Sequence, residues 1–368
     1  MRINFVTFGM RLTGGIRVVA EIINHLAERG HQMSLVTFGS PEDLNWINLK
    51  AKVYYANRSL PQKISGYLYW QAFGFQPWPE EETRRLLKVM PDCDINVATI
   101  SYSAYAVNRS GKGVPFHYYM HYEPLVREEG YKKKIIEESY FLPTKKIVNS
   151  SWLARQIKER TNQDVAGLVF PAIDHSIFYP RKEKSAARKG SKIRIVSLAK
   201  YKWWKGLPDA LKAIQMVRDR GYDVDFQTFG GVFDRNILPE EVKNIEFTFV
   251  GSRINEQLAE FYSDADILIS ASYFESFPLP PIEAMACGTP VVTTVYGTED
   301  YVFNGRNALV VEPKRPEQMA EAIIELIEND SLYNQLREEG IKTAKSFTWE
   351  KTAEKMEEIS KKTLESNE

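Results

Sequence analysis

The amino-acid sequence predicts an α/β protein made of two Rossmann-like domains, each built on a parallel sheet. The chain has 368 residues, which is too long for one compact α/β domain and suits two. Short apolar runs of strand length alternate with segments of helical periodicity in both halves of the chain. A polar stretch over 181–192 separates the halves. We therefore expect an N-terminal domain over 1–180, a C-terminal domain over 181–347 and a tail helix over about 348–368.

The first half opens with a strand, a glycine-bearing loop, a helix and a second strand, expected over 3–8, 9–15, 16–29 and 33–38. The glycines do not form G-x-G-x-x-G, and no acidic residue closes the second strand, so a dinucleotide site is not expected. Gly14 and Gly15 instead predict a loop whose backbone closely approaches a ligand, for which a phosphate is a candidate. A plain tight turn is the alternative.

Two later segments of this half carry candidate contact residues. The aromatic stretch 66–79 is expected to pack against the N-terminal domain, although aromatic rings also stack on sugars and favour membrane interfaces. Lys132 to Lys134, next to Tyr131, could touch acidic lipid headgroups, or they could form an ordinary solvated face.

Two of the five histidines lie on an expected strand that follows another strand over 94–100. His117 and His121 are four residues apart, which on a strand separates them by about 13 Å, so a shared metal ion is rejected. His121, at the carboxyl end, is a candidate hydrogen-bonding or charge-stabilising group, whereas His117 is expected in the core. A short strand from Lys146 then leads into a helix with Ser150 or Ser151 as N-cap.

The second half restarts the pattern with a strand over 193–198, a basic loop and a helix over 208–220. Lys200 and Lys205 in this loop are placed to neutralise a diphosphate at the helix N-terminus. Two further strands, over 224–229 and 245–250, end just before glycines, and a nucleobase could lie between their loops near Gly230 and Arg253.

The stretch 265–294 predicts a βαβ unit, in which a helix starting near Pro281 ends at Gly288. Glu275 lies in the loop after its first strand, and Glu283 is expected in the first turn of the helix. Ligands of open α/β sheets bind beyond the carboxyl ends of the strands, where a carboxylate can hold two sugar hydroxyls. The alternative is that Glu283 only complements the helix dipole and Glu275 is solvated. Two amphipathic helices are expected over 316–346.

Composition excludes several classes of function. The chain has 48 Lys and Arg residues and 48 Asp and Glu residues, so it has no net positive charge that would attract nucleic acid. Cys93 and Cys287 have apolar surroundings typical of reduced core thiols. The chain enters a strand at once with no secretory segment, and no run reaches the roughly 20 apolar residues of a membrane span. We expect a cytoplasmic protein, with peripheral contact at the inner membrane face left open.

The segment from Glu275 to Glu283, followed by Ala-Met-Ala-Cys-Gly-Thr-Pro-Val-Val, resembles the E-x7-E signature of the retaining glycosyltransferases of family four, the glycosyl transferases group 1. Further matches occur in order along nearly the whole chain at Gly14-Gly15, Met120-His121, 171–180, Lys205-Gly206 and Glu299. The resemblance implies the GT-B architecture, in which two Rossmann-like domains face each other across a cleft and the C-terminal helix crosses back to the N-terminal domain.

The resemblance also implies roles for residues of this chain. Glu283 would hold the ribose of a nucleoside-diphosphate sugar, and Glu275 the hydroxyls of the transferred sugar. Lys200 and Lys205 would neutralise the diphosphate, Gly15 would donate its N–H to it, and His121 would face the anomeric centre. The implied catalytic residues are His121, Glu275 and Lys205. The implied donor-binding residues are Gly14, Gly15, Lys200, Lys205, Gly230, Arg253, Glu275, Phe277, Pro278, Leu279 and Glu283.

No cofactor and no metal are implied, since the nucleotide sugar is a substrate. UDP is the default base, with GDP and dTDP open, and the acceptor would be a hydroxyl of a glycan, glycolipid or lipid-linked molecule. The sequence departs from the family at Lys200, where arginine is usual, and at Pro278, which removes one backbone N–H. Retention is expected by front-face attack, in which the departing phosphate takes the acceptor proton.

Three other functions stay open at this point. A GT-B nucleotide-sugar epimerase would act without an acceptor. A phosphorylase would need a pyridoxal lysine and a far longer chain. A non-catalytic nucleotide-sugar-binding subunit would bind the donor and transfer nothing.

Overall fold

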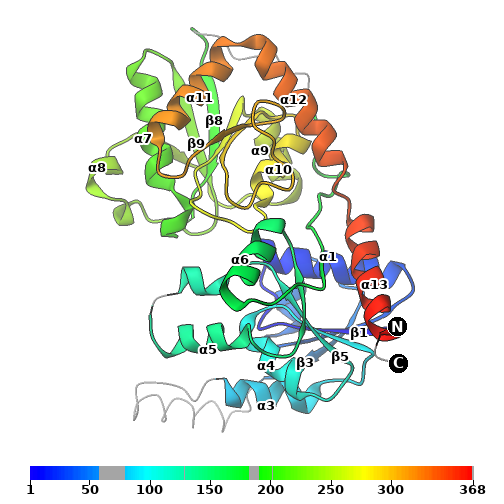
Figure 1. The fold of residues 1–368 in the computed structure, drawn as a ribbon. Helices are drawn as coiled ribbons and strands as arrows, with labels where there is room; N and C mark the ends of the chain where they lie inside the picture. Colours follow the sequence, from blue (N-terminus) through cyan, green and yellow to red (C-terminus); the bar gives the residue numbers. More distant parts are fainter. Residues whose placement is uncertain (58–78, 128, 182–189, 201, 367–368) are drawn as a thin grey trace. The chain divides into compact units, whose positions relative to one another are not determined.

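The computed structural model describes residues 1–57, 79–127, 129–181, 190–200 and 202–366, and the chain divides into two compact units (Figure 1). The N-terminal unit comprises Met1–Phe170 and Trp349–Glu368, and the C-terminal unit comprises Pro171–Thr348. The expected boundary at residue 180 is too late, because the segment after Pro171 packs on the C-terminal unit. The Ile173 N–H donates to the Phe347 carbonyl oxygen at 3.2 Å, and the ring of Phe178 lies 6.4 Å from that of Tyr262. Most of the expected linker, and nearly all of the aromatic stretch 66–79, lie outside the described residues.

The N-terminal unit is built on a seven-stranded sheet in which all neighbouring strands are parallel, in the order β3-β2-β1-β4-β5-β6-β7. Its strands are β1 (Arg2–Val6), β2 (Gln32–Thr37), β3 (Lys52–Tyr55), β4 (Ile95–Ala98), β5 (Val114–Tyr119), β6 (Lys145–Val148) and β7 (Gly167–Leu168). Its helices are α1 (Gly14–Glu28), α3 (Glu80–Val89), α4 (Ser101–Arg109), α5 (Tyr131–Ser139), α6 (Ser151–Thr161) and α13 (Trp349–Glu365). Ser150 is the N-cap of α6, and its hydroxyl accepts the Leu153 N–H at 3.1 Å.

Buried amides connect the central strands of this sheet. The Asn4 side chain on β1 donates to the Asn96 side-chain oxygen on β4 at 2.9 Å, and the Ser34 hydroxyl on β2 donates to Asn4 at 2.8 Å. These pairs fix the register of three strands, because a slip of one residue would turn each amide to the other face of the sheet.

The last helix, α13, packs on α1 within the N-terminal unit (Figure 1). The Arg29 guanidinium donates to the Glu357 carboxylate at 2.6 Å. Ion pairs with Lys361 and Arg29 lower the pKa of the Glu357 carboxyl to about 2. The tail therefore belongs to the N-terminal unit, as the sequence led us to expect.

The C-terminal unit has a six-stranded parallel sheet in the order β10-β9-β8-β11-β12-β13. Its strands are β8 (Ile193–Leu198), β9 (Val224–Phe229), β10 (Thr248–Phe249), β11 (Ile267–Ser270), β12 (Val291–Thr294) and β13 (Leu309–Val311). Its helices are α7 (Leu207–Asp219), α8 (Glu240–Lys243), α9 (Asn255–Asp264), α10 (Leu279–Ala286), α11 (Pro316–Glu328) and α12 (Asp330–Lys345). Helix α7 packs on α11, and α10 packs on α9 and α12.

No helix within the described ranges is both long and apolar enough to cross a bilayer. The same residues contain no group of three or more His, Cys, Asp or Glu side chains arranged to hold a metal ion.

Candidate active site

The carboxyl ends of β8 and β11 bring Lys205 and Glu275 together. The Lys205 ammonium pairs with the Glu275 carboxylate, and the two side chains are 15% and 13% exposed. Gly206, directly after Lys205, has φ +63°, and a β-carbon there would overlap the Ala271 carbonyl oxygen. The loop after β8 therefore lies directly against the loop after β11, which places Lys205 beside Glu275.

A second glycine supports Glu275 from the other side. Gly297 has φ +87°, and a β-carbon at this position would overlap the Glu275 carbonyl oxygen. The Glu275 N–H donates to the Tyr296 carbonyl oxygen at 3.3 Å. The backbone of Glu275 is thus held by the loop after β12, and its side chain is held by Lys205.

Lys200 adds a second positive charge to this edge. Its pKa lies below that of a free lysine because its surroundings desolvate the ammonium group and because Lys205 repels it, while Glu275 acts in the opposite direction. The charges of Lys205 and Glu275 both act on Lys200, and the loop after β8 carries both lysines.

Glu283 does not lie in the first turn of its helix, contrary to the sequence prediction. Helix α10 begins at Leu279, so Glu283 is its fifth residue, beyond the reach of the terminal dipole. Its side chain is buried, with the residue 5% exposed, and accepts the Tyr262 hydroxyl at 3.2 Å. The Tyr262 hydrogen bond offsets part of the cost of burying this carboxylate. Its place beyond the first turn excludes compensation of the helix dipole as its role.

The start of α10 also offers fewer donors than we expected. Pro280 and Pro281 occupy its second and third positions and have no N–H, so Leu279 is the only one of these three residues with a donor. Phe277, expected at the donor, has its ring packed 4.9 Å from Tyr301 and 5.6 Å from Phe347. Its side chain belongs to the core, which leaves only its backbone for a ligand.

Tyr301 was missed by sequence reasoning. Its hydroxyl donates to the carbonyl oxygen of Pro278, the N-cap of α10, at 2.7 Å. Burial and the charges of Glu275 and Glu283 raise the pKa of this hydroxyl well above its usual range, so it remains a donor. Tyr301 lies two residues after Glu299, in the segment that follows β12. Its closeness in sequence to Glu299 was the only feature that could have marked it as part of the site.

Gly230 and Arg253 lie in adjoining loops at the same edge of the sheet. The Gly230 N–H donates to the Gly251 carbonyl oxygen at 3.0 Å, which joins the loops after β9 and β10. A β-carbon on Gly230 would overlap the Ala199 carbonyl oxygen, so close packing by itself requires glycine here. The half-buried Arg253 donates to the Ser252 carbonyl oxygen at 3.2 Å.

The remaining predicted residues come together in the N-terminal unit. Gly14 and Gly15 are the first two residues of α1 rather than a loop, and the N-cap Thr13 accepts the Ile16 N–H at 3.3 Å. A β-carbon on Gly15 would lie 3.7 Å from Met120, the neighbour of His121. The start of α1 therefore adjoins the residues that follow β5.

His121 is half-buried, and its carbonyl oxygen accepts the Tyr140 hydroxyl at 3.1 Å. His117 is fully buried in the core, as predicted, and burial lowers its pKa well below the usual value. On the neighbouring strand Lys146 is also buried, and burial lowers its pKa to about 8.

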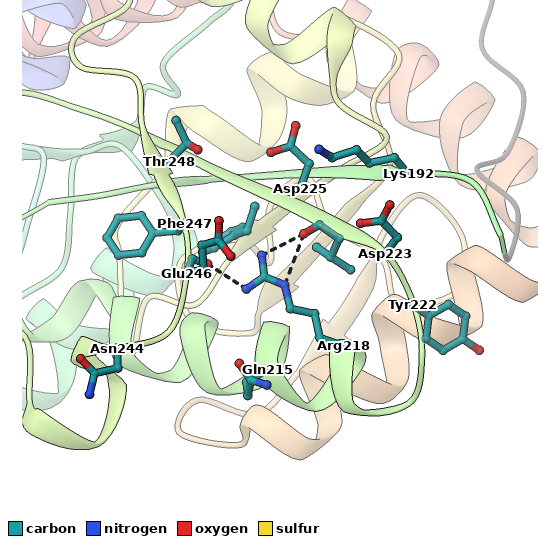
Figure 2. A pocket seen from close by; sticks show the side chains of 12 residues that line it. Lys192, Gln215, Arg218, Tyr222, Asp223, Asp225, Asn244, Glu246, Phe247 and Thr248 are labelled. Atoms are coloured by element: carbon teal, nitrogen blue, oxygen red, sulfur yellow. Dashed lines mark hydrogen bonds between the residues drawn. The ribbon is translucent and has the colours of Figure 1, made fainter.

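The larger hollow of the C-terminal unit lies at the opposite, amino-terminal edge of the sheet (Figure 2). It measures about 400 Å³, and Arg218 crosses it to donate to the carbonyl oxygens of Val224 and Glu246, both at 2.8 Å. A much smaller hollow at the carboxyl edge is lined by Lys205, Glu275 and Pro278. The candidate site is this smaller hollow, because the predicted charged residues lie there.

Comparison with known proteins agrees with this geometry. Residues 179–343 match the family described as "Glycosyl transferases group 1". This match lies within the C-terminal unit. One relative, the D-inositol 3-phosphate glycosyltransferase of Arthrobacter sp. (strain FB24), is 28% identical over 63% of this chain and 57% of its own length. An uncharacterized glycosyltransferase of Methanocaldococcus jannaschii is 33% identical over 38% of this chain and 42% of its own length. The chain thus spans roughly half the length of these curated relatives.

Solved structures resemble the whole chain in fold. Sucrose-phosphate synthase from Thermosynechococcus elongatus aligns with a TM-score of 0.74 at 18% identity, over 100% of both chains. Anabaena HepE, solved in complex with UDP and glucose, aligns with a TM-score of 0.74 at 15% identity, also over 100% of both chains. The expected GT-B fold is confirmed.

Proposed function

We propose that this protein is a retaining, metal-independent glycosyltransferase that moves a hexosyl group from a nucleoside-diphosphate sugar to an acceptor hydroxyl. The observation that carries the proposal is the Lys205–Glu275 ion pair at the carboxyl edge of β8 and β11, with Lys200 beside it and buried Glu283 on α10. The match of residues 179–343 to the glycosyl transferases group 1 supports the same function.

Each charged group has a distinct task in this proposal. Glu283 accepts hydroxyl donors of the ribose, and Glu275 those of the transferred sugar. Lys205 has three N–H donors, so it can hold Glu275 and donate to a phosphate at the same time. Breakage of the anomeric bond leaves new negative charge on the diphosphate, and positioned cations such as Lys200 and Lys205 stabilise the transition state that leads to it.

The proposed retention does not use an enzyme nucleophile. The acceptor hydroxyl attacks from the face that the diphosphate leaves, and the departing phosphate takes its proton. His121 stabilises the sugar near its anomeric centre, and the Gly14-Gly15 start of α1 donates to the diphosphate. A covalent glycosyl adduct on Glu275, sought by mass spectrometry after rapid quenching with the donor, would contradict this route.

For the donor we propose a UDP-linked hexose, with GDP and dTDP sugars as the alternatives to test. HepE was solved with UDP-glucose as well as with UDP, which supports this choice. For the acceptor we propose a glycan, a glycolipid or a lipid-linked molecule, reached from the cytoplasmic side of the membrane. Tyr131 is the first residue of α5 and Phe141 lies two residues after its end; both are exposed and favour a membrane interface.

Thermal unfolding with a panel of nucleoside diphosphates and their sugars tests the function. A nucleotide present at 100 times its Kd adds about 2.7 kcal/mol to the free energy of unfolding. We expect one base to shift the melting temperature and Glu283→Gln to lose that shift. No shift with any nucleotide would refute the proposal. Binding with isomerisation of the sugar and no acceptor would indicate an epimerase, and binding without any turnover a non-catalytic subunit.

The membrane part of the proposal has its own test. Substitution of Lys132 to Lys134 by glutamate should reduce sedimentation with vesicles that contain acidic phospholipid. Unchanged sedimentation would contradict the membrane contact, whereas the proposed glycosyl transfer does not depend on this result.

A further inference from the structure

A cluster of aromatic residues, one of which is largely exposed, lies directly beside the Lys205–Glu275 pair. Two aromatic residues precede each member of the pair, Trp203-Trp204 before Lys205 and Tyr273-Phe274 before Glu275. The Tyr273 N–H donates to the Trp204 carbonyl oxygen at 2.7 Å, which joins the two segments through their backbones. We call Trp203, Trp204, Tyr273 and Phe274 the aromatic cluster.

The rings of the aromatic cluster hold Trp203 in a fixed orientation. Its ring centroid lies 5.8 Å from that of Trp204 at 81° and 5.7 Å from that of Phe274 at 66°, both edge to face. Trp204 and Phe274 stack on each other, with centroids 6.2 Å apart. Trp204 is almost buried, whereas Trp203 is 61% exposed. Trp203 is therefore positioned by its neighbours while most of its surface stays available.

Charged groups surround the aromatic cluster. The Lys314 ammonium lies 4.9 Å from the centre of the Tyr273 ring. Lys314 has φ +61°, a left-handed conformation that a residue with a β-carbon seldom adopts. Burial and the Asp209 carboxylate raise the pKa of the Tyr273 hydroxyl, which places an acidic group at the same end of the sheet.

This combination suits a sugar better than a base or a membrane. A hexose has an apolar C–H face that stacks on an aromatic ring and a rim of hydroxyls that bind charged groups. The expected base position, at Gly230 and Arg253, follows β9 and β10, whereas the aromatic cluster follows β8 and β11 and meets the loop after β13. A sugar can use the Glu275 and Asp209 carboxylates as well as the Lys314 ammonium, whereas the phosphate of an acidic lipid headgroup could use only the ammonium.

We propose that Trp203 is a stacking surface for a hexose ring, supported from behind by Trp204 and Phe274. The inference rests on the proposed function, because the hexose belongs either to the nucleotide-sugar donor or to a glycan acceptor. Trp203 binds this ring and takes no part in bond breakage.

Binding measurements on Trp203→Ala and Trp203→Phe test the proposal. Phe303→Ala is the matched control, because Phe303 is also a large exposed aromatic residue of the C-terminal unit. Calorimetry with UDP, UDP-glucose and the corresponding GDP and dTDP compounds compares nucleotide with nucleotide sugar. Saturation-transfer NMR with methyl hexosides and short glucans reports contact with a hexose that carries no nucleotide.

We expect Trp203→Ala to weaken hexose binding by about tenfold, as for the loss of one stacking contact, and Trp203→Phe to retain part of it. Affinity for the bare nucleoside diphosphate should change by less than about twofold. Loss confined to the nucleotide sugar identifies the donor hexose, and loss confined to the methyl hexosides or glucans identifies the acceptor.

The proposal is overturned if Trp203→Ala and Phe303→Ala bind every hexose probe as the unsubstituted protein does. It is also overturned if Trp203→Ala loses only vesicle binding, or only affinity for the nucleoside diphosphate. If no nucleotide binds the unsubstituted protein, the proposed transferase fails, while the NMR measurement still decides whether Trp203 binds a hexose.

Discussion

Removal of one member of the Lys205–Glu275 pair should destabilise the C-terminal unit far more than removal of both. The two side chains are 15% and 13% exposed, so either charge left alone would be largely desolvated. Loss of one partner of a buried pair costs about 3–5 kcal/mol, and the remaining exposure reduces our expectation for Lys205→Met to about 2–4 kcal/mol. Glu275→Gln should behave alike, whereas the double variant should lose only about 1 kcal/mol.

Urea unfolding of the four proteins, followed by tryptophan fluorescence, measures this coupling. The Arg220–Glu321 pair of the same unit is the control, because its side chains are 50% and 60% exposed. Arg220→Met should leave the urea midpoint nearly unchanged, because exposed ion pairs contribute little to stability. Additive effects of Lys205→Met and Glu275→Gln, each no larger than that of Arg220→Met, would refute the reasoning. In a transfer assay both single variants should be slower by about a hundredfold or more.

Three further expectations concern stability. Tyr301→Phe should lower the free energy of unfolding by about 0.5–1.5 kcal/mol, since it removes the buried hydrogen bond from Tyr301 to the Pro278 carbonyl oxygen; an unchanged urea midpoint would show that this hydrogen bond contributes nothing. Gly206→Ala should be far more destabilising than Gly221→Ala, because both glycines have positive φ but only the first β-carbon would overlap backbone; equal melting temperatures would contradict the close approach. Burial lowers the pKa of Lys146 to about 8 in the folded protein, whereas in the unfolded chain it is near 10.5. Between these two pH values the Lys146 amine is protonated mainly in the unfolded chain, so the free energy of unfolding should rise with pH. The rise should reach about 3 kcal/mol and be absent in Lys146→Met, and parallel pH profiles of the two proteins would count against it.

The parts of the fold that the sequence predicted best are the buried central elements. The predicted strands 193–198 and 224–229 coincide with β8 and β9, whose residues form a continuous apolar or alternating pattern bounded by polar residues and glycine. The strands β3, β7 and β13 were not predicted, and the expected strand 245–250 shrinks to β10. These four short strands lie at the edges of the two sheets, where pairing rather than composition decides their extent.

The part of the candidate site that could be predicted consists of residues that follow neighbouring strands of the sheet. Glu275 and Lys205 follow neighbouring parallel strands, so their proximity follows from the topology. The start of α10 was placed too late, because prolines can fill the first turn of a helix as well as precede it. Tyr262 and Tyr301 could not be predicted, because their hydroxyls reach Glu283 and Pro278 across 21 and 23 residues of sequence.

The position of α13 has a consequence for synthesis of the protein. The apolar face of α1 is completed by a helix that leaves the ribosome only after the entire C-terminal unit. At 5–20 residues per second, the intervening segment takes on the order of ten to forty seconds to translate. The C-terminal unit is contiguous and can close on itself during that interval, while the nascent N-terminal unit still exposes the surface that α13 will cover. The C-terminal unit would then be the first to complete its fold, although it is translated later. A chaperone that binds exposed apolar surface would bind the nascent chain at α1.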